Sequence, residues 1–248
     1  AGVFNVVTGE GAVVGAAIAD SMDVDVLVFT GSGGTGRRLL EAAARSNLKR
    51  VYLELGGKSP NIVFADAPDL DEAAKVSAHG IFRNSGQVCI AGSRILVERS
   101  IHAAFVEKLA AHAAAIRVGN PLDNATQSGA VNSERQLEQN LAFVAEARDA
   151  GRNVIGGARI LQETGGFYMS PAIVADARPA DRVFRQEVFG PVVTVTSFDT
   201  EAEAVALAND TSFGLAAAVW TSNLSRAHRM VRKIRAGLVH VNTYGGAG

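Results

Sequence analysis

The chain carries one cysteine, Cys89, within residues 84–94 (NSGQVCIAGSR), and a candidate base, Glu54, within residues 53–61 (LELGGKSPN). A cysteine attacks as its thiolate, and a positioned base can activate either the thiol or a later water. The two side chains are therefore a minimal set for covalent catalysis. Small flexible residues interrupt the apolar run around Cys89, which favours a turn or irregular segment, where functional residues concentrate. Taken alone, a single cysteine in a globular chain is more often a small buried apolar residue than a nucleophile.

Composition excludes several classes of protein. The 248 residues are 48% hydrophobic with a net charge of −1, enough to bury one large core or two smaller ones. A single cysteine excludes a disulfide framework and a thiol-rich metal site, and it fits a reducing, cytoplasmic location. The histidines are scattered without metal-ligand spacing, so we expect no metal. Balanced charge and short apolar runs predict neither a nucleic-acid partner nor a membrane partner.

The two ends of the chain and a basic cluster near the C-terminus give further expectations about the organisation of the protein. The chain opens on apolar residues 3–7 without an initiator methionine and closes on a glycine-rich stretch, so we expect a fragment of a longer protein. The basic cluster at residues 226–235 has apolar residues at helical spacing, which predicts a solvated amphipathic helix.

The first sixty residues alternate apolar runs with helical patterns. The pattern predicts strands at residues 3–7, 24–29 and 51–53 and helices near residues 12–20 and 35–46. This βαβαβ order is typical of a parallel, doubly wound sheet. We assign residues 1–57 to this unit.

Glycines mark both strand-to-helix turns of this unit. In the second turn Gly31, Gly33 and Gly36 satisfy G-x-G-x-x-G after a strand and before a helix, the context in which the pattern indicates a dinucleotide phosphate site. A tight glycine turn without a ligand is the alternative. Glu54 follows about twenty residues later, where an acid would hold ribose hydroxyls. The spacing does not separate this role from that of a base beside Cys89.

The remainder of the chain reads as a second α/β unit, which we place at residues 58–242, with a loop at residues 243–248. Strands are predicted at residues 61–64, 95–98, 192–196, 216–220 and 237–242, and helices near residues 70–82, 102–116 and 134–150. Cys89 and Glu54 then lie near the boundary of the two units, a common location for active sites.

Four stretches together resemble the NAD(P)-dependent aldehyde dehydrogenases in order and spacing over almost the whole chain. They are residues 29–36, 53–61 (LELGGKSPN), 86–94 (GQVCIAGSR) and 186–191 (QEVFGP). The resemblance implies an α/β fold in which part of a Rossmann-type coenzyme domain is followed by an α/β catalytic domain. It also implies oxidation of an aldehyde, a small-molecule substrate, to a carboxylic acid.

The resemblance assigns roles to the two chemical residues. Cys89 is similar to the family's nucleophile, which forms a thiohemiacetal with the aldehyde and, after hydride transfer to the nicotinamide, a thioester. Glu54 is similar to the base that activates the hydrolytic water. The backbone N–H of Cys89 is expected to donate to the developing oxyanion, a type of contact worth about 3 kcal/mol.

Further residues match coenzyme positions of the family. Gly11, Gly31, Ser32, Gly36 and Leu55 look like parts of its coenzyme site. Glu187 is similar to the glutamate that holds the nicotinamide ribose, and Phe189 to its aromatic neighbour. NAD is the expected coenzyme, with NADP as the alternative, because no arginine near Glu54 is placed for a 2′-phosphate.

The departures from the family set the remaining expectations. Family members are roughly twice as long and form homodimers or homotetramers, so we expect this chain alone to bind NAD weakly and turn over little aldehyde. Residues 81–84 and 217–229 look most like the bacterial members that act on aminoaldehydes, such as the gamma-glutamyl-gamma-aminobutyraldehyde dehydrogenases. The alternatives are an acylating relative that uses coenzyme A, and a non-catalytic relative that keeps the fold.

Overall fold

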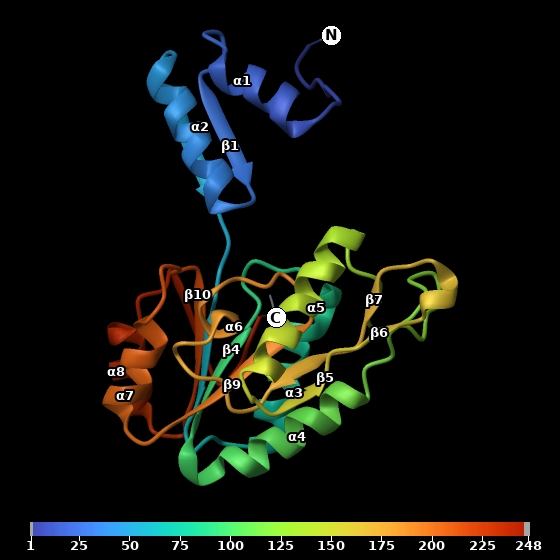
Figure 1. Ribbon diagram of the computed structural model, residues 1–248. Coiled ribbons are helices and arrows are strands. Elements are labelled where there is room, and N and C mark those ends of the chain that lie inside the picture. The colour runs from blue at the N-terminus through green and yellow to red at the C-terminus, as the bar shows by residue number, and fades with distance from the viewer. Residues whose placement is uncertain (1, 246–248) are drawn as a thin grey trace. The chain divides into compact units, whose positions relative to one another are not determined.

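The chain folds into two compact units, which divide after Gly56. The computed structural model describes residues 2–245 (Figure 1). The expected loop at residues 243–248 therefore lies partly outside the described residues. We describe each unit by itself.

The first unit is a small α/β unit built on two parallel strands, β1 and β2. Its elements are the π-helical turn η1 (Gly11–Gly15), α1 (Ala16–Asp20), β1 (Val26–Thr30), α2 (Gly33–Arg45) and β2 (Arg50–Glu54). The apolar face of α2 packs with α1 and the strands, where Ala19, Leu39 and Ala42 are buried. The predicted order of helix, strand, helix and strand is therefore confirmed over residues 11–54.

The strand predicted at residues 3–7 is wrong. This segment is irregular, and the side chains of Val3 and Phe4 are 104% and 86% exposed. A strand needs a hydrogen-bonded neighbour. Within the described residues the sheet of this unit consists of β1 and β2 alone, and residues 3–7 pair with neither strand.

The second unit is built on a seven-stranded sheet in the order β11-β10-β3-β4-β9-β8-β5. Its strands are β3 (Pro60–Val63), β4 (Arg94–Glu98), β5 (Val154–Gly156), β8 (Ala172–Val174), β9 (Val192–Phe198), β10 (Ala216–Trp220) and β11 (Leu238–Val241). Neighbouring strands are parallel except for β5, which runs antiparallel to β8. The short strands β6 (Arg159–Ile160) and β7 (Tyr168–Met169) form a separate hairpin.

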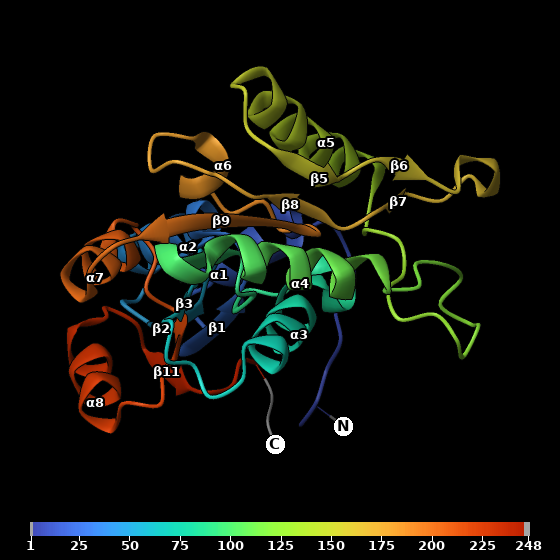
Figure 2. The ribbon, with the colours of Figure 1, turned by 90° about the horizontal axis from the view of Figure 1, so that it is seen from below.

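Helices cover both faces of this sheet. They are α3 (Leu70–Phe82), α4 (His102–Ala114), α5 (Glu134–Asp149), α6 (Arg182–Arg185), α7 (Glu201–Asn209) and α8 (Leu224–Lys233), with short 3₁₀ turns at Arg83–Gly86, Arg99–Ile101 and Gln162–Thr164. Figure 2 shows α3 and α4 on one side of the sheet and α7 and α8 on the other. No helix within residues 2–245 is long and apolar enough to cross a membrane.

The central strands β3 and β4 supply side chains to two cores. Along β3, Val63 packs with α3 and α4, whereas its neighbour Ile62 packs with α7 and α8. The same alternation holds in β4, where Ile95 and Leu96 enter opposite cores. Successive side chains of a strand point to opposite faces, so a continuous apolar run serves a sheet that is covered on both sides.

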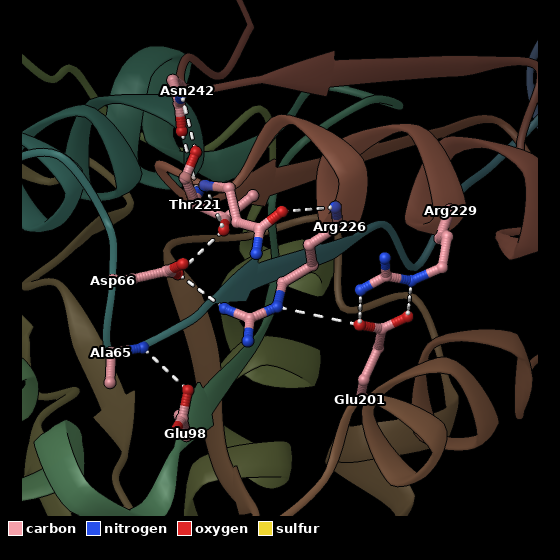
Figure 3. A network of polar contacts seen from close by, with 9 residues as sticks. Ala65, Asp66, Glu98, Glu201, Thr221, Arg226, Arg229 and Asn242 are labelled. Carbon is pink, nitrogen blue, oxygen red and sulfur yellow. Dashed lines mark hydrogen bonds and ion pairs between the residues drawn. The ribbon is translucent and has the colours of Figure 1, made fainter.

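The segments that follow β3, β10 and β11, together with residues of α7 and α8, carry a network of paired polar groups, which we call the carboxyl edge (Figure 3). Asp66 accepts hydrogen bonds from the Thr221 hydroxyl at 2.8 Å and from Arg226 at 2.7 Å. The Asn242 amide exchanges hydrogen bonds with the backbone of Thr221 at 2.9 and 3.1 Å. Glu201 at the start of α7 receives the Arg229 guanidinium. These contacts join the strand ends to α7 and α8.

Candidate active site

Three segments of the second unit precede the parallel strands β3, β4 and β9, and we call them together the amino edge. They are residues 57–59, 87–93 and 187–191. Because the three strands run in the same direction, these segments meet at one edge of the sheet. Cys89, Glu187 and Phe189 all lie in them.

The approach to Cys89 is a strained turn. Asn84, Ser85 and Gly86 have φ angles of 50°, 53° and 71°, so three consecutive residues adopt the left-handed region that L side chains rarely adopt. The Ser85 hydroxyl donates to the carbonyl of Gly129 at 2.7 Å, and the Asn84 amide donates to the carbonyl of Gln87 at 3.0 Å. Such backbone strain persists only where surrounding contacts over-determine it, and it is frequent at functional sites.

Two glycines let neighbouring segments approach the cysteine segment. A Cβ at Gly57 would lie 2.3 Å from the carbonyl oxygen of Cys89, and one at Gly86 would lie 2.0 Å from that of Gly190. Any larger residue would separate the backbones. The glycines therefore hold the three segments of the amino edge in backbone contact.

Cys89 is a free, half-buried thiol. The Tyr244 hydroxyl donates to the carbonyl of its neighbour Ile90 at 2.6 Å. Burial raises the pKa of Tyr244, so the phenol stays protonated and keeps this donor. A Cβ at Gly80 or Gly92 would meet the Tyr244 ring at 2.7 and 2.9 Å, so the ring is clamped between α3 and the cysteine segment.

Glu187 is a half-buried carboxylate beside this segment. Its Oε1 accepts a hydrogen bond from the backbone N–H of Gly57 at 3.1 Å. Burial raises the pKa of Glu187, while this hydrogen bond and the charge of Lys58 act in the opposite direction. Phe189 is 37% exposed and has a φ angle of 54°, a strained conformation for an aromatic residue. The structure thus brings Cys89, Gly57 and Glu187 together within one unit.

Lys58 was not among the candidate residues from the sequence. Its side chain is 1% exposed, and its Nζ has no hydrogen-bond partner among the described residues. Burial, with the charge of Arg94 as a second cause, lowers the pKa of Lys58 to about 7. The available signal was a lysine at the start of a short buried strand, directly after two glycines.

The other predicted residues lie in the first unit. Gly31 joins β1 to α2, and its N–H donates to the carbonyl of Glu54 at 3.0 Å. Ser32 is the N-cap of α2, where its hydroxyl accepts from the N–H of Thr35 at 3.2 Å. The cap occupies the N–H of Thr35, whereas the N–H groups of Gly33 and Gly34 in the same turn have no partner among the described residues, the arrangement that binds phosphate.

Gly36 and Leu55 contact each other within that unit. A Cβ at Gly36 would approach the Leu55 side chain to 3.0 Å, so the third glycine of the motif permits close packing of α2 on β2. Glu54 ends β2 and is exposed, and Gly11 begins η1 and is also exposed. Their contacts with residues of the second unit stay predictions.

A hollow of about 820 Å³ opens in the second unit between α3 and α4. Its wall is largely apolar and includes Phe82, Ile116 and Tyr244, while Arg83 and His79 add polar groups. This volume suits a small molecule. Tyr244 connects the hollow to the cysteine segment through its hydrogen bond to Ile90.

Comparison with known proteins identifies the family. The family model described as "Aldehyde dehydrogenase family" matches residues 1–247. The NADP/NAD-dependent aldehyde dehydrogenase PuuC of Escherichia coli (strain K12) is 47% identical over 98% of this chain and 48% of its own. The chain belongs to the aldehyde dehydrogenase family. It spans about half the length of the curated relatives it matches.

Solved structures show the same fold. The P. syringae AldA indole-3-acetaldehyde dehydrogenase, in complex with NAD+ and IAA, is 50% identical with a TM-score of 0.98, covering 100% of this chain and 50% of its own. The gamma-glutamyl-gamma-aminobutyraldehyde dehydrogenase from Burkholderia cenocepacia J2315 is 51% identical with a TM-score of 0.91, covering 94% and 47%. The predicted aldehyde dehydrogenase-like α/β fold is therefore confirmed.

Proposed function

We propose that this chain carries the catalytic cysteine and the hydrolytic base of an enzyme that oxidises an aldehyde to a carboxylic acid with NAD, or with NADP. The observation that carries the proposal is the segment around Cys89. This segment is strained, is held by backbone contacts at Gly57 and Gly86, and presents a half-buried free thiol. Such an arrangement fixes a nucleophile in one orientation.

The chemistry can be followed on the residues of this chain. The Cys89 thiolate attacks the carbonyl carbon, forming a C–S bond and an oxyanion. The N–H of Cys89, which has no hydrogen-bond partner among residues 2–245, is free to donate to that oxyanion. Loss of hydride from the same carbon gives the thioester. Glu54 then takes a proton from water, the resulting hydroxide adds to the thioester, and the C–S bond breaks to release the acid and the thiolate.

The coenzyme fits the groups that would hold it. The capped amino terminus of α2 offers N–H groups to a pyrophosphate, and the half-buried Glu187 offers a carboxylate to ribose hydroxyls. When bound, the nicotinamide coenzyme supplies the hydride acceptor. Gly11, Leu55 and Phe189 complete the proposed coenzyme contacts. Relatives that are complexed with NAD+ support this assignment.

The hollow between α3 and α4 is the place we propose for the body of the aldehyde. Tyr244 lines it and contacts the residue next to Cys89. An aminoaldehyde is the proposed substrate, supported by the PuuC and gamma-glutamyl-gamma-aminobutyraldehyde dehydrogenase relatives. A cytoplasmic location and a homodimeric or homotetrameric full-length protein are proposals on the strength of the family resemblance.

The reactivity of Cys89 tests the nucleophile. Because it is the only cysteine, its alkylation by iodoacetamide at pH 7 can be followed in the native chain and, as a matched control, in the same chain unfolded in urea. We expect the native thiol to react at least about tenfold faster, because a positioned thiolate is the reactive form. Cys89→Ser should abolish labelling. A native rate at or below that of the unfolded chain contradicts the proposal.

Hydrolysis of an activated ester separates the roles of the two residues. With p-nitrophenyl acetate we expect steady release of nitrophenolate by the wild type, one burst without turnover by Glu54→Gln, and neither by Cys89→Ser. An acylating relative would instead accumulate the acyl-enzyme in the wild type and release it only when coenzyme A is added. That result would replace the hydrolytic function by the acylating one.

A further inference from the structure

Two lysines are buried in this chain, and their surroundings differ. Lys49 in the first unit is 7% exposed, and its Nζ donates to the carbonyl of Ala19 and to the hydroxyl of Ser46 at 2.5 and 2.8 Å. Lys58 is 1% exposed, and its Nζ makes no hydrogen bond within residues 2–245. Burying an ammonium group without partners is costly. The unfavourable free energy of burying the Lys58 ammonium group therefore requires an explanation beyond side-chain packing.

Glu187 is the negative charge that acts on Lys58. The positive charge of Arg94 on β4 opposes the protonated form of Lys58, and Glu187 before β9 favours it. Arg235 lines the same small cavity as Lys58 and adds no negative charge. Glu187 is fixed beside Lys58 because its Oε1 accepts from the N–H of Gly57, the preceding residue.

Arg94 does not compete for this carboxylate. Its Nε donates to the carbonyl of Lys58 at 3.3 Å, and its terminal nitrogens donate to the carbonyls of Leu207 and Ala208, each at 2.7 Å. These carbonyls belong to the last turn of α7, where a cation is favourable. The guanidinium group of Arg94 therefore donates its hydrogen bonds to backbone carbonyls. Lys58 is the cation whose charge lowers the pKa of Glu187.

We propose that Lys58 is a positioning residue for Glu187, whose ammonium group keeps the half-buried carboxylate ionised and ready to accept hydrogen bonds from a vicinal diol. Burial alone drives a carboxyl group towards its neutral form, and a nearby opposite charge counteracts this. Only the ionised form accepts with both oxygens. The identification of the diol as the coenzyme ribose rests on the proposed function. The electrostatic coupling of Lys58 and Glu187 is independent of that function.

The two groups titrate as a coupled pair. The pKa of Lys58 is lowered to about 7 and that of Glu187 is raised, so the two charged forms support each other below neutral pH. When Lys58 loses its proton above pH 7, the support for ionised Glu187 weakens. The pair therefore gives diol binding at this edge a dependence on Lys58 that a purely structural lysine would not produce.

Carboxyl-carbon NMR on the whole chain labelled with [¹³Cδ]glutamate tests the coupling directly. Glu187→Gln assigns the resonance. We expect Lys58→Met to raise the apparent pKa of Glu187 by at least about half a pH unit and Lys58→Arg to restore it towards the wild-type value. Lys75→Met, which removes an exposed lysine paired with Glu72, is the matched control and should leave it unchanged. An unchanged Glu187 pKa in Lys58→Met overturns the proposal.

The reciprocal measurement keeps the proposal testable if Lys58→Met does not fold. Glu187→Gln alters a partly exposed residue, and we expect it to lower the pKa of Lys58 further, followed by ¹⁵N NMR of Nζ. An unchanged Lys58 pKa in this variant also overturns the coupling. If the pKa values shift as expected but Glu187→Gln leaves NAD binding by the chain unaltered, the ribose role in the proposed function fails while the coupling stands.

Discussion

The carboxyl edge and the amino edge lie at opposite ends of the same parallel strands, and their polar groups are treated differently by the fold. At the carboxyl edge, Asp66, Thr221 and Arg226 are paired by hydrogen bonds of 2.7 and 2.8 Å and tie the strand ends to α8. At the amino edge, Lys58 is buried without a hydrogen-bond partner among the described residues, and the turn at residues 84–86 that leads into the cysteine segment has three consecutive positive φ angles. The carboxylates of the carboxyl edge are paired, although the Arg226 Nε has no hydrogen-bond partner among the described residues, whereas the amino edge combines a strained backbone with an unpaired ammonium group.

This difference indicates that the carboxyl edge contributes mainly to folding stability and that the amino edge is the better candidate for binding and reaction. A satisfied network contributes to the free energy of folding, and its paired groups are not available to a ligand. Strained backbone and unpaired buried charge cost folding free energy and are frequent at functional sites, which supports the proposal that the reacting groups lie at the amino edge. In this chain the thiol, the half-buried Glu187 and Lys58 all lie at that edge.

The largest effect is expected from Gly86→Ala. The residue has a φ angle of 71°, and a Cβ would lie 2.0 Å from the carbonyl oxygen of Gly190, which is backbone and cannot turn aside. We expect a loss of at least about 4 kcal/mol in the free energy of unfolding, or failure to fold. Urea denaturation followed by circular dichroism measures it.

Gly151→Ala is the matched control for this prediction. Gly151 has the same φ angle of 71° but nothing within 4 Å of an added Cβ. Its cost should be limited to the backbone conformation, about 1 kcal/mol. Equal losses in the two variants would show that the contact between the segments of the amino edge contributes nothing.

A gain in stability is expected from Lys58→Met, with a defined pH dependence. The lysine is charged in both states below pH 7, so the folded chain carries the full cost of a buried charge. Between about pH 7 and 10.5 the folded form is neutral and the unfolded form is charged, so this cost shrinks and vanishes above pH 10.5. We expect a gain of about 3 kcal/mol at pH 6 that falls by about 2 kcal/mol by pH 9.

Urea unfolding of wild type and Lys58→Met at the two pH values checks this prediction. Lys49→Met provides the comparison, because Lys49 is buried with two hydrogen-bond acceptors, and its replacement should destabilise the chain. A gain for Lys58→Met that is the same at both pH values would mean that Lys58 is not a buried titrating charge.

The smallest effect is expected at the carboxyl edge, from Arg226→Met. The Arg226 and Asp66 side chains are 25% and 38% exposed, so solvent screens part of their attraction, and the guanidinium also stacks on the Phe64 ring. We expect a loss of about 1–2 kcal/mol at neutral pH. The exposed Arg229, paired with Glu201, is the control, and Arg229→Met should cost less than about 0.5 kcal/mol in the same denaturation measurement.

Long periodic segments of the fold were predictable from the sequence. The apolar runs and helical patterns placed β3, β4, β10 and α3 within a residue or two of their observed bounds. The short strands β5 to β8 and the helix α7 were not predicted. Strands of two or three residues carry no measurable periodicity, and α7 is apolar nearly all round, so position in the fold decides their structure.

The residues of the candidate site likewise divide into those that were predictable from the sequence and those that were not. Cys89, Glu187 and Phe189 were recognisable because their motifs are long, and the structure places all three at the amino edge. Lys58 and Tyr244 were missed. Their importance depends on what surrounds them, an apolar enclosure for the lysine and two glycines for the tyrosine ring, and that information lies far away along the chain.

The sequence by itself determined the family, predicted the order of the longer elements and supplied Cys89 as the candidate nucleophile, because residue types at fixed local spacing carry that information. Only the tertiary structure decided that Gly57, Cys89 and Glu187 come into contact and that Lys58, next to Gly57, is buried without a hydrogen-bond partner among the described residues. Contacts between segments more than a hundred residues apart follow from strand order and parallel direction. Burial and charge at those contacts then set the ionisation of the groups.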